Sequence, residues 1–462
     1  MMPAPRPPRT APDLRGARVV VAGAAKSGVA LARFLLARGA SVTLSDQRQA
    51  RDLGPEVAAL AARGVAFEFG RHEEATFSGA DLVVVSPGVP LSIQPLAAAR
   101  RRGVRVVAEV EVASWYLEGT LIGITGSNGK STTTALAGHL LARAGRNAVA
   151  CGNLGTPLIE TLEQDAPDRL YVVELSSFQL EGIETFRPHV SVLLNLSPDH
   201  QDRYPDTAAY YAAKGRLFMN QKAADHAVLN QDDEAVALLA RGIAPRRHGF
   251  SRAGRVADGA YVRGADILLV EDGREQPVLP VKDLPLFGVH NQENVMAALL
   301  VARLCGVAAE QAADGVRSFR GLPHRLERVR DLGGVSWFND SKATNVGAAA
   351  QSLRSFAGGV VLIMGGKDKG GTFADLTSLV RDRVTHLVLL GKAKETIARQ
   401  IGPIVPTILV EDMEDAVAAA RVAALPGGVV LLAPGCASFD QYSGFEARGE
   451  HFRSLVNALE ET

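Results

Sequence analysis

Short apolar runs alternate with amphipathic stretches along the chain. Val19–Ala22 is a β-branched run that ends at a glycine turn, and residues 27–39 (SGVALARFLLARG) then have the spacing of an amphipathic helix. A second strand is predicted at Ser41–Ser45, ending at Asp46, and AFEFG and DLVVVSPG add two more. Strands that alternate with helices of about a dozen residues predict a parallel sheet with right-handed crossovers. We place this first domain at residues 1–108.

The same alternation continues in two further segments. The second, at residues 109–321, opens with a strand at Leu121–Thr125, a glycine-rich loop and a helix, and it closes with the helical run HNQENVMAALLVARLCG. Between them we expect two buried strands, at Tyr171–Leu175 and Val190–Leu196, and a β meander with Asp-Gly turns at residues 250–285. The third segment, residues 322–462, has predicted strands at Gly359–Met364, His386–Leu390 and Val429–Ala433. The pattern therefore predicts an α/β protein of three domains.

Composition narrows the class of protein. The 462 residues are 47% hydrophobic, and 50 Lys+Arg balance 50 Asp+Glu. Without a basic excess, binding to nucleic acid or to an anionic membrane is not expected. Three widely spaced cysteines (Cys151, Cys305, Cys436) exclude a disulfide scaffold and suit a reducing cytoplasm. No apolar run approaches the ~20 residues of a membrane helix, and the start MMPAPRPPRTAP lacks the apolar stretch of a signal peptide.

The strongest chemical signal is GITGSNGKSTTT at residues 123–134, between a predicted strand and a predicted helix. The backbone N–H groups of such a loop point at phosphate oxygens, Lys130 would reach the β- and γ-phosphates, and Ser131 would hold Mg²⁺. The strict P-loop spacing asks for glycine where Ile124 stands. A plain glycine turn is the alternative, but the strand–loop–helix context favours ATP binding.

The first domain has a weaker glycine turn at Gly23–Gly28, without the full GxGxxG pattern. Asp46 ends the next strand, where a ribose-binding acid would sit. Alone, this would suggest a dinucleotide oxidoreductase. Two nucleotide loops need two nucleotides, however, so the second nucleotide could be part of the substrate. A packing turn without a ligand stays an alternative.

Possible metal ligands follow two of the predicted strands. Glu174 ends YVVEL, and Asp199 and His200 follow VSVLLNL, so they are predicted to bind Mg²⁺ or orient phosphate beside the glycine loop. Either position alone could be a solvated turn. Lys214 is ambiguous, because a lysine on an amphipathic helix is usually a surface residue. In the last domain WFNDSKATN, IMGGKDKGG and APGCASFDQYSGFEARG each follow an apolar strand, and together they are expected to close on a ligand.

Seven spaced motifs resemble those of the Mur ligases of peptidoglycan synthesis, over nearly the whole chain. They are TGSNGKST, ELSSFQL, LSPDHQDRY with AAKGRLF, GVHNQENVMAAL, PHRLE, NDSKATN and PGCASFDQ. NDSKATN, GGKDKGG and ASFDQYSGFEARG are most similar to the members that add D-glutamate to UDP-N-acetylmuramoyl-L-alanine, and no DNPR-type signature of the diaminopimelate- or lysine-adding members is found. The resemblance implies a Rossmann-like first domain that holds UDP, a P-loop-type central ATPase domain and a Rossmann-like C-terminal domain that binds the amino acid.

The resemblance also implies residue roles. ATP would be bound by Gly126, Ser127, Asn128, Gly129, Lys130, Ser131, Thr132, Asn294, Arg325 and Asp340. Two Mg²⁺ ions would be held by Ser131, Glu174, His200 and a carbamylated Lys214; the catalytic residues would be Lys130, His200 and Lys214. The UDP-muramoyl-alanine substrate would meet Lys26, Ser27, Asp46, Ser86, Gly88, Asn153, Ser176 and Gln179. D-Glutamate would meet Thr344, Lys369, Ser438, Phe439 and Phe445, with Lys367 as an alternative to Lys369. Gln47-Arg48 follows Asp46, where a threonine is common.

The implied reaction has two steps: the alanyl carboxylate is phosphorylated by ATP, and the amine of D-glutamate then displaces phosphate. The implied protein is a monomeric cytoplasmic enzyme that supports cell-wall synthesis, cell shape and division. Three alternatives are weaker. A P-loop motor or switch protein would need a Walker B aspartate and would leave residues 337–449 without a purpose. A nicotinamide dehydrogenase needs neither Lys130 nor Mg²⁺, and a folylpolyglutamate synthetase lacks a UDP-binding domain at its start.

Overall fold

The computed structural model describes residues 11–200, 203–368, 370 and 372–460. The chain divides into two compact units. Unit 1 is Met1–Leu284 with Gln292–Phe319, and unit 2 is Pro285–Asn291 with Arg320–Thr462. Unit 1 holds two sheets and unit 2 holds one. The predicted α/β fold class is confirmed, whereas the predicted domain limits stay predictions.

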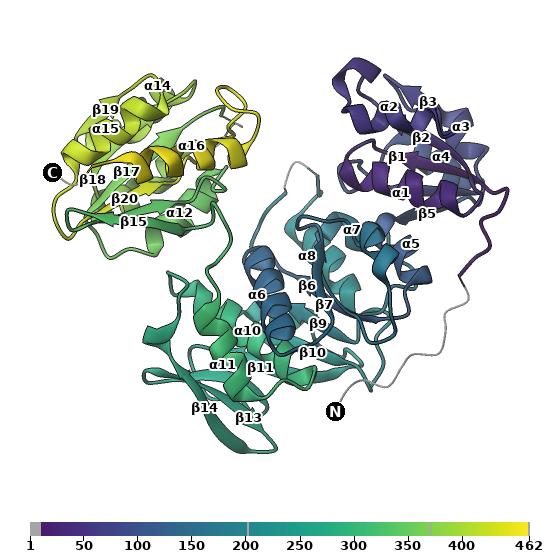
Figure 1. Ribbon diagram of the computed structural model, residues 1–462, viewed down its shortest axis with the longest axis horizontal. Coiled ribbons are helices and arrows are strands. Elements are labelled where there is room, and N and C mark those ends of the chain that lie inside the picture. The colour runs from purple at the N-terminus through teal and green to yellow at the C-terminus, as the bar shows by residue number, and fades with distance from the viewer. Residues whose placement is uncertain (1–10, 201–202, 369, 371, 461–462) are drawn as a thin grey trace. The chain divides into compact units, whose positions relative to one another are not determined.

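The first sheet of unit 1 has five parallel strands in the order β3-β2-β1-β4-β5. Helices cover both of its faces (Figure 1). Alternate side chains of β1 point to opposite faces, so Val19 and Val21 lie in one apolar cluster and Val20 and Ala22 lie in another. Its elements are β1 (Arg18–Ala22), α1 (Lys26–Ala37), β2 (Ser41–Asp46), α2 (Pro55–Ala61), β3 (Ala66–Phe69), α3 (Glu74–Ser78), β4 (Leu82–Val85), α4 (Gln94–Arg101) and β5 (Arg105–Ala108).

The middle sheet has nine strands in the order β14-β13-β12-β11-β10-β9-β6-β8-β7. In this spatial order, all neighbouring strands from β12 to β7, β6 included, pair in parallel. β13 and β14 are added antiparallel beside β12. The elements are α5 (Glu109–Tyr116), β6 (Thr120–Thr125), α6 (Lys130–Arg143), β7 (Ala148–Gly152), β8 (Leu170–Glu174), α7 (Ser177–Glu181), β9 (Val190–Leu193), α8 (Thr207–Gly215), β10 (His226–Asn230), α9 (Glu234–Leu239), β11 (Arg246–Ser251), β12 (Gly259–Arg263), β13 (Asp266–Glu271), β14 (Arg274–Pro280), α10 (His290–Leu304) and α11 (Ala309–Ser318).

The meander predicted at residues 250–285 is correct only in its second half. β12, β13 and β14 are joined by two-residue turns, the second at Asp272–Gly273, where φ is +48° and +76°. The other Asp-Gly pair is not a hairpin turn, because β11 and β12 are parallel. Gly259 instead allows close strand contact: a Cβ there would lie 1.7 Å from the carbonyl oxygen of Gly249.

One apolar core joins the two sheets of unit 1. The same cluster contains Val21 of β1, Trp115 of α5 and Tyr171 of β8. The buried carboxylate of Glu111 on α5 adds a polar anchor, because it accepts hydrogen bonds from the backbone N–H groups of residues 184–186 at 2.8–2.9 Å. The first and middle sheets therefore form a single compact body.

Unit 2 has a six-stranded sheet in the order β15-β16-β20-β17-β18-β19, parallel except for β15. Its two faces bury separate apolar clusters, with Leu362 and Leu431 in one and Val361 and Val430 in the other. Its elements are β15 (Glu327–Leu332), β16 (Val335–Asn339), α12 (Val346–Arg354), β17 (Val360–Gly365), α13 (Thr377–Arg383), β18 (Val384–Leu390), α14 (Lys394–Ile401), β19 (Thr407–Leu409), α15 (Met413–Ala423), β20 (Val429–Leu432) and α16 (Phe445–Ala458). The three strands predicted for this segment are present.

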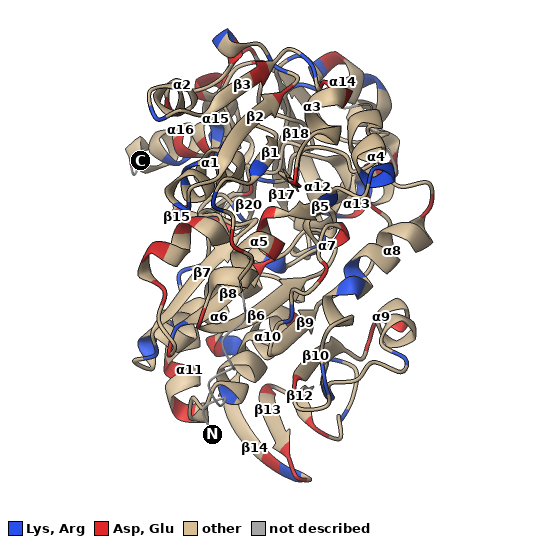
Figure 2. Ribbon diagram, turned by 90° about the vertical axis from the view of Figure 1, so that its right-hand side faces the viewer, with Lys and Arg blue, Asp and Glu red and all other residues tan. Residues whose placement is uncertain are grey.

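Charged residues of both signs are interspersed over the elements (Figure 2), which agrees with the balanced composition. Cys151, Cys305 and Cys436 are buried, and none of the three is part of a disulfide. Among the described residues, no helix combines the length and the apolar character that crossing a membrane requires.

Candidate active site

Three neighbouring parallel strands of the middle sheet end at one edge. β6 lies between β8 and β9 and pairs with both. The glycine loop follows β6, Glu174 is the last residue of β8, and Asp199 and His200 come after β9. Since the carboxyl ends of parallel strands share an edge, these groups from distant parts of the sequence lie together.

The glycine loop is shaped by two residues with positive φ, Gly126 at +156° and Gly129 at +82°. Gly129 precedes the first residue of α6, and a Cβ there would lie 2.3 Å from Oδ1 of Asn294. That amide oxygen also accepts a hydrogen bond from Thr133 at 3.2 Å, so Asn294 of α10 lies against the loop. Lys130 Nζ donates to the carbonyl oxygens of Gly126 at 2.8 Å and Ser127 at 2.9 Å. Asn128 is exposed at the loop tip, and Ser131 is buried.

Lys214 is not a surface residue. Only 1% of it is exposed, and its Nζ donates to Gly126 O at 2.9 Å and lies 4.7 Å from the centre of the Tyr210 ring. Burial, and then the charge of Lys130, lower the pKa of Lys214 well below its ordinary value, although Asp199 and Glu174 act in the opposite direction. An uncharged amine beside the glycine loop is therefore favoured.

Glu174 offers a carboxylate oxygen without a hydrogen-bond partner. The residue is 2% exposed, and its Oε1 accepts a hydrogen bond from Asn153 Nδ2 at 2.7 Å. Oε2 is buried and unpaired. A buried carboxylate normally has all of its oxygens satisfied, so this atom marks a place for a cation or a donor. Within the described residues no group of three or more His, Cys, Asp or Glu side chains is arranged to hold a metal. A metal here would therefore also depend on Ser131, Lys214 or phosphate oxygens.

An aromatic wall surrounds His200, which has a φ of +53°. Its ring lies 4.7 Å from that of Phe178 and 5.8 Å from that of Tyr210. The Tyr210 hydroxyl is 3.3 Å from Ser127 Oγ, which donates to Ser197 O at 3.0 Å. Burial raises the pKa of Tyr210 to about 12. The wall holds the glycine loop and the His200 segment in one arrangement.

Ser176 and Gln179 have a clear structural function at the start of α7. The Ser176 hydroxyl accepts from the Gln179 N–H at 3.3 Å, and Gln179 Oε1 accepts from the Ser176 N–H at 3.0 Å. This reciprocal pair is a capping box, which the spacing S-x-x-Q also predicts. It places α7 directly after Glu174.

The first sheet carries a cavity of about 360 Å³ at its carboxyl edge. It brings together Asp46, Ser86 and Gly88, whereas Lys26 and Ser27 lie beyond its lining at the start of α1, where Lys26 Nζ donates to Gly155 O at 2.8 Å. Burial raises the pKa of Asp46, but hydrogen bonds from Arg48 and from the Ala24 N–H outweigh it and bring the pKa to about 2. Arg48, which belongs to the Gln47-Arg48 pair that stands where a threonine is common, thus forms an ion pair with Asp46 at the cavity wall.

In unit 2 the strands β16, β20 and β17 are neighbours, so the three predicted loops follow adjacent carboxyl ends. Asp340 is half-buried. Desolvation of its carboxyl group raises the pKa, while hydrogen bonds from the Ser352 hydroxyl and the Leu326 N–H and the charge of Arg325 act against this. Lys367 is paired through its backbone with Ala437. Lys369 lies outside the described residues.

The other predicted amino-acid-binding residues of unit 2 differ in exposure. Ser438 is buried, Thr344 is half-buried and Phe439 is 67% exposed. Phe445 begins α16, and Lys342 Nζ lies 3.8 Å from the centre of its ring.

Three family descriptions match the chain in order. They are the Mur ligase MurD-like N-terminal domain at residues 17–108, the Mur ligase middle domain at 124–302 and the Mur ligase glutamate ligase domain at 324–436. A protein of Geotalea uraniireducens (strain Rf4) named UDP-N-acetylmuramoylalanine--D-glutamate ligase is 47% identical over 97% of this chain and 99% of its own. A protein of Acidobacterium capsulatum with the same name is 46% identical over 96% and 97%. The chain belongs to the Mur ligase family.

Two solved structures agree with this fold. A pseudomurein peptide ligase type C from Methanothermus fervidus superposes with a TM-score of 0.60 at 17% identity, covering 96% of this chain and 100% of that one. The UDP-N-acetylmuramate-alanine ligase MurC from Thermotoga maritima gives 0.58 at 17% identity, covering 96% and 99%. At such identity the likeness shows the fold alone.

Two residues of this Mur ligase contribute to the sites without having been predicted. Tyr210 was hidden in the aromatic pair of YYAAK, and Arg448 lies in the FEARG segment. Arg448 is 3% exposed and donates to the carbonyl oxygens of Ser341 at 2.9 Å and Cys436 at 3.2 Å. It therefore connects two of the three loops of unit 2. In the sequence, the only indication of this role is that a charged residue stands in the FEARG part of a predicted loop motif.

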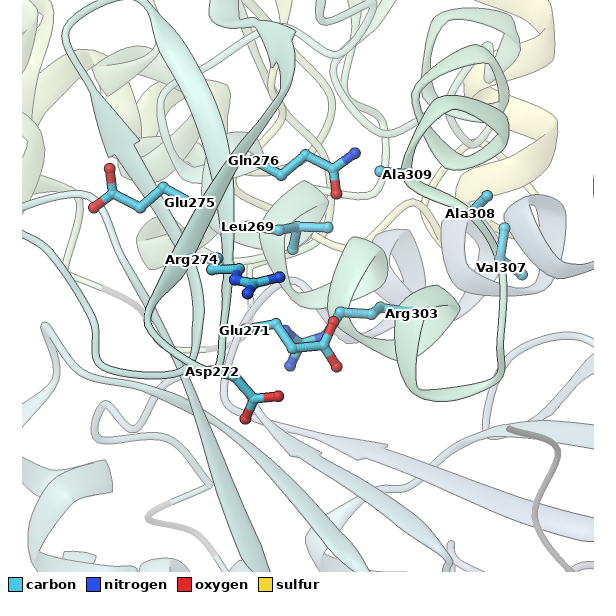
Figure 3. Close-up of a pocket in the computed structure, with 10 residues that line it drawn as sticks. All are labelled: Leu269, Glu271, Asp272, Arg274, Glu275, Gln276, Arg303, Val307, Ala308 and Ala309. Carbon is cyan, nitrogen blue, oxygen red and sulfur yellow. The ribbon is translucent and has the colours of Figure 1, made fainter.

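A cavity of about 620 Å³ lies between the β13–β14 hairpin and the end of α10 (Figure 3). Arg303 on its wall is already paired, donating to the Asp258 carboxylate at 2.7 Å and to Val270 O at 2.8 Å. None of the predicted site residues that the structure describes lines this cavity.

Proposed function

We propose that this Mur ligase joins D-glutamate to the alanyl carboxylate of UDP-N-acetylmuramoyl-L-alanine at the expense of ATP. The observation that carries the proposal is the edge of the middle sheet, where the glycine loop, the unpaired oxygen of Glu174 and the buried Lys214 lie together. The identity of the amino acid is supported by the full-length relatives named for D-glutamate.

The donor set fits a hard divalent cation. Glu174 supplies a buried, unpaired carboxylate oxygen and Ser131 a buried hydroxyl, and Mg²⁺ prefers oxygen ligands. We assign Glu174, Ser131, His200 and Lys214 to two Mg²⁺ ions. Bound Mg²⁺ would neutralise negative charge on the ATP phosphates.

Lys214 fits this role only in a modified form, because an ammonium group would repel the cation. Its surroundings favour the uncharged amine. An uncharged amine has the lone pair that adds to the carbon of CO₂. Loss of one proton from the nitrogen to solvent then leaves a carbamate, which presents oxygen ligands. We therefore propose that Lys214 is carbamylated.

The reaction proceeds by two displacements. An oxygen of the alanyl carboxylate attacks the γ-phosphorus of ATP, and ADP leaves. The amine of D-glutamate, after loss of a proton, attacks the acyl carbon, and phosphate leaves with the carboxylate oxygen that carried it. Lys130 holds phosphate oxygens as their charge grows, and the buried edge limits the access of water to the acyl phosphate.

Each part of the chain receives one task in this proposal. The cavity of the first sheet takes UDP, with Asp46, Ser86 and Gly88 in its wall and Lys26 and Ser27 beside it. Asn153, Ser176 and Gln179 face the muramoyl-alanine part. In unit 2, Arg325 and Asp340 contribute to ATP binding, and D-glutamate is bound by Thr344, Ser438, Phe439, Phe445 and one of Lys367 and Lys369. We propose a cytoplasmic monomer.

The test is phosphate release from ATP in the presence of Mg²⁺, with each substrate omitted in turn. We expect release only when UDP-N-acetylmuramoyl-L-alanine and D-glutamate are both present. L-Glutamate should be used at least 10²-fold less well, because the opposite hand leaves a buried carboxylate unpaired. Equal use of L-lysine or L-alanine would contradict the proposal.

A further inference from the structure

Arg203 lies between β9 and α8 of the middle sheet, and its side chain contacts the loop that follows β4 of the first sheet. Its Nη1 donates to Pro87 O and its Nη2 to Val89 O, both at 3.1 Å. These carbonyls flank Gly88, which lines the 360 Å³ cavity together with Ser86 and Val89. The two arms of one guanidinium therefore hold the wall of this cavity from outside, in a fork geometry that a single ammonium group cannot reproduce.

The same guanidinium is held to the His200 region by stacking. Its Cζ lies 3.7 Å from the centre of the Phe178 ring, and that ring also lies 4.7 Å from the His200 ring and 6.0 Å from the Tyr204 ring. Phe178 belongs to α7, which begins three residues after Glu174. Arg203 is thus the centre of a short chain of contacts that runs from the cavity loop through Phe178 to His200.

Two other arginines of unit 1, Arg100 and Arg105, provide comparisons for this connection. Arg100 on α4 donates to Leu91 O at 3.0 Å, beyond the two carbonyl groups that Arg203 holds, and it also interacts with the charge of Glu181 on α7. Arg105 crosses between the two sheets, donating to Glu184 Oε2 at 3.1 and 2.6 Å, but it contacts neither the cavity loop nor His200. Both arginines thus interact with glutamates of the middle sheet's segment, but neither donates to Pro87 O or Val89 O, so they serve as controls.

We propose that Arg203 is a positioning residue that fixes the nucleotide-binding loop 86–89 relative to His200 and the phosphoryl-transfer edge. The inference rests on the proposed function, in which one substrate is anchored at its UDP end and reacts at its alanyl end. A substrate held at both ends transmits any shift between the two anchors to the reacting carboxylate. Misplacement by about 1 Å can cost roughly 10²-fold in rate.

The test compares Arg203→Ala with Arg100→Ala and Arg105→Ala. We expect Arg203→Ala to lower kcat about 10²-fold at saturating substrates, while the Kd of UDP alone, measured by calorimetry, changes by no more than about threefold. UDP binding should persist because Ser86 Oγ still donates to Gly23 O at 3.1 Å within the first sheet. Both control variants should keep kcat within about threefold of the wild type.

A second variant guards against misfolding. Phe178→Leu keeps both hydrogen bonds of Arg203 but removes the ring that connects it to His200, so the same split between kcat and UDP affinity is expected. Arg203→Lys should behave like Arg203→Ala, because the fork is lost. Wild-type kcat in Arg203→Ala would overturn the inference, as would a parallel loss of kcat and UDP affinity in Arg203→Ala and Arg100→Ala. Absence of ligation by the wild-type enzyme would instead contradict the proposed function on which the inference rests.

Discussion

Two lysines approach the same carbonyl oxygen at the glycine loop. Lys130 and Lys214 lie 2.8 and 2.9 Å from Gly126 O. Two ammonium groups that share one acceptor oxygen repel each other, and burial further disfavours a positive charge on Lys214, the more buried of the two. The site therefore lowers the pKa of the more buried lysine, Lys214, and shifts its amine toward the uncharged form. The lysines of TGSNGKST and AAKGRLF therefore have two different chemical tasks.

Replacing Lys214 tests this division of tasks. Lys214→Ala and Lys214→Arg should each lower kcat by roughly 10²-fold or more, because neither side chain can become a carbamate and arginine keeps its charge. The matched control is Lys222→Ala, at an exposed position. Steady-state phosphate release and circular dichroism of all three variants give the comparison. A fully active, folded Lys214→Arg would rule out the carbamate.

At the scale of elements, helix α5 carries two buried glutamates with opposite requirements. Glu111 accepts hydrogen bonds from three backbone N–H groups, from Trp115 Nε1 and from the Thr185 hydroxyl. Glu109 accepts one, from the Ile159 N–H at 2.7 Å, and its Oε2 is buried and unpaired. Burial raises the pKa of Glu109 from 4.5 to about 7. The helix thus stabilises a charge at one position and penalises it at the other.

The pH dependence of stability follows from the sign of this shift. The folded state binds the Glu109 proton more tightly than the unfolded chain, so the contribution of Glu109 to stability is fully present below pH 4.5 and is lost as pH rises through about 7. Glu109→Gln mimics the protonated acid and should raise the free energy of unfolding at pH 8 by up to about 3 kcal/mol, with little change at pH 5. Urea unfolding at both pH values measures this.

Glu111→Gln is the matched control two residues along the helix. Its amide nitrogen would face donors, so it should destabilise unit 1 by about 1–3 kcal/mol at pH 8. A Glu109→Gln protein that is less stable than the wild type at pH 8 would contradict the account of α5.

The glycine loop gives a second prediction at this scale. Gly129→Ala should abolish ATP use, because the new Cβ would lie 2.3 Å from Asn294 Oδ1 and would displace the loop. Gly145→Ala has a similar φ of +75° with nothing within 4 Å of its Cβ. Both changes should cost about 1–2 kcal/mol of stability through backbone strain. Only Gly129→Ala should lose ATP binding, which calorimetry with ATP can show; equal ATP affinity in both variants would contradict the assignment.

The alternation of apolar runs was sufficient to predict the strands that meet at the site, since β6, β8 and β9 are continuous and β-rich. Some polar or short strands were missed. β15 reads ERVRDL because one face meets solvent, and β10 (HAVLN) is short and flanked by polar residues. The burial of Lys214 could not be predicted, because helical spacing does not say which neighbour covers a face. Contacts such as Arg203 with Pro87 join residues 116 positions apart and leave no local pattern.

In the whole molecule, the two steps of the proposed reaction depend on groups from both units. Unit 1 carries the groups proposed to phosphorylate the carboxylate, and unit 2 carries those proposed to bind D-glutamate. Binding of an amino acid should therefore stabilise unit 2 in particular. D-Glutamate at 100 times its Kd should add about 2.7 kcal/mol to the unfolding free energy of the unit that binds it. Hydrogen exchange with and without D-glutamate should show this protection in residues 320–460; protection confined to unit 1 would contradict the assignment.

The most direct test of the central claim follows the oxygen atoms of the alanyl carboxylate. UDP-N-acetylmuramoyl-L-alanine labelled with heavy oxygen in that carboxylate is incubated with the enzyme, ATP, Mg²⁺ and D-glutamate, and the products are weighed by mass spectrometry. The account predicts that the nucleotide product gains one glutamyl residue and keeps one labelled oxygen in its new amide, while the released phosphate carries the other. Unlabelled phosphate, or a nucleotide product without the glutamyl residue, would contradict it.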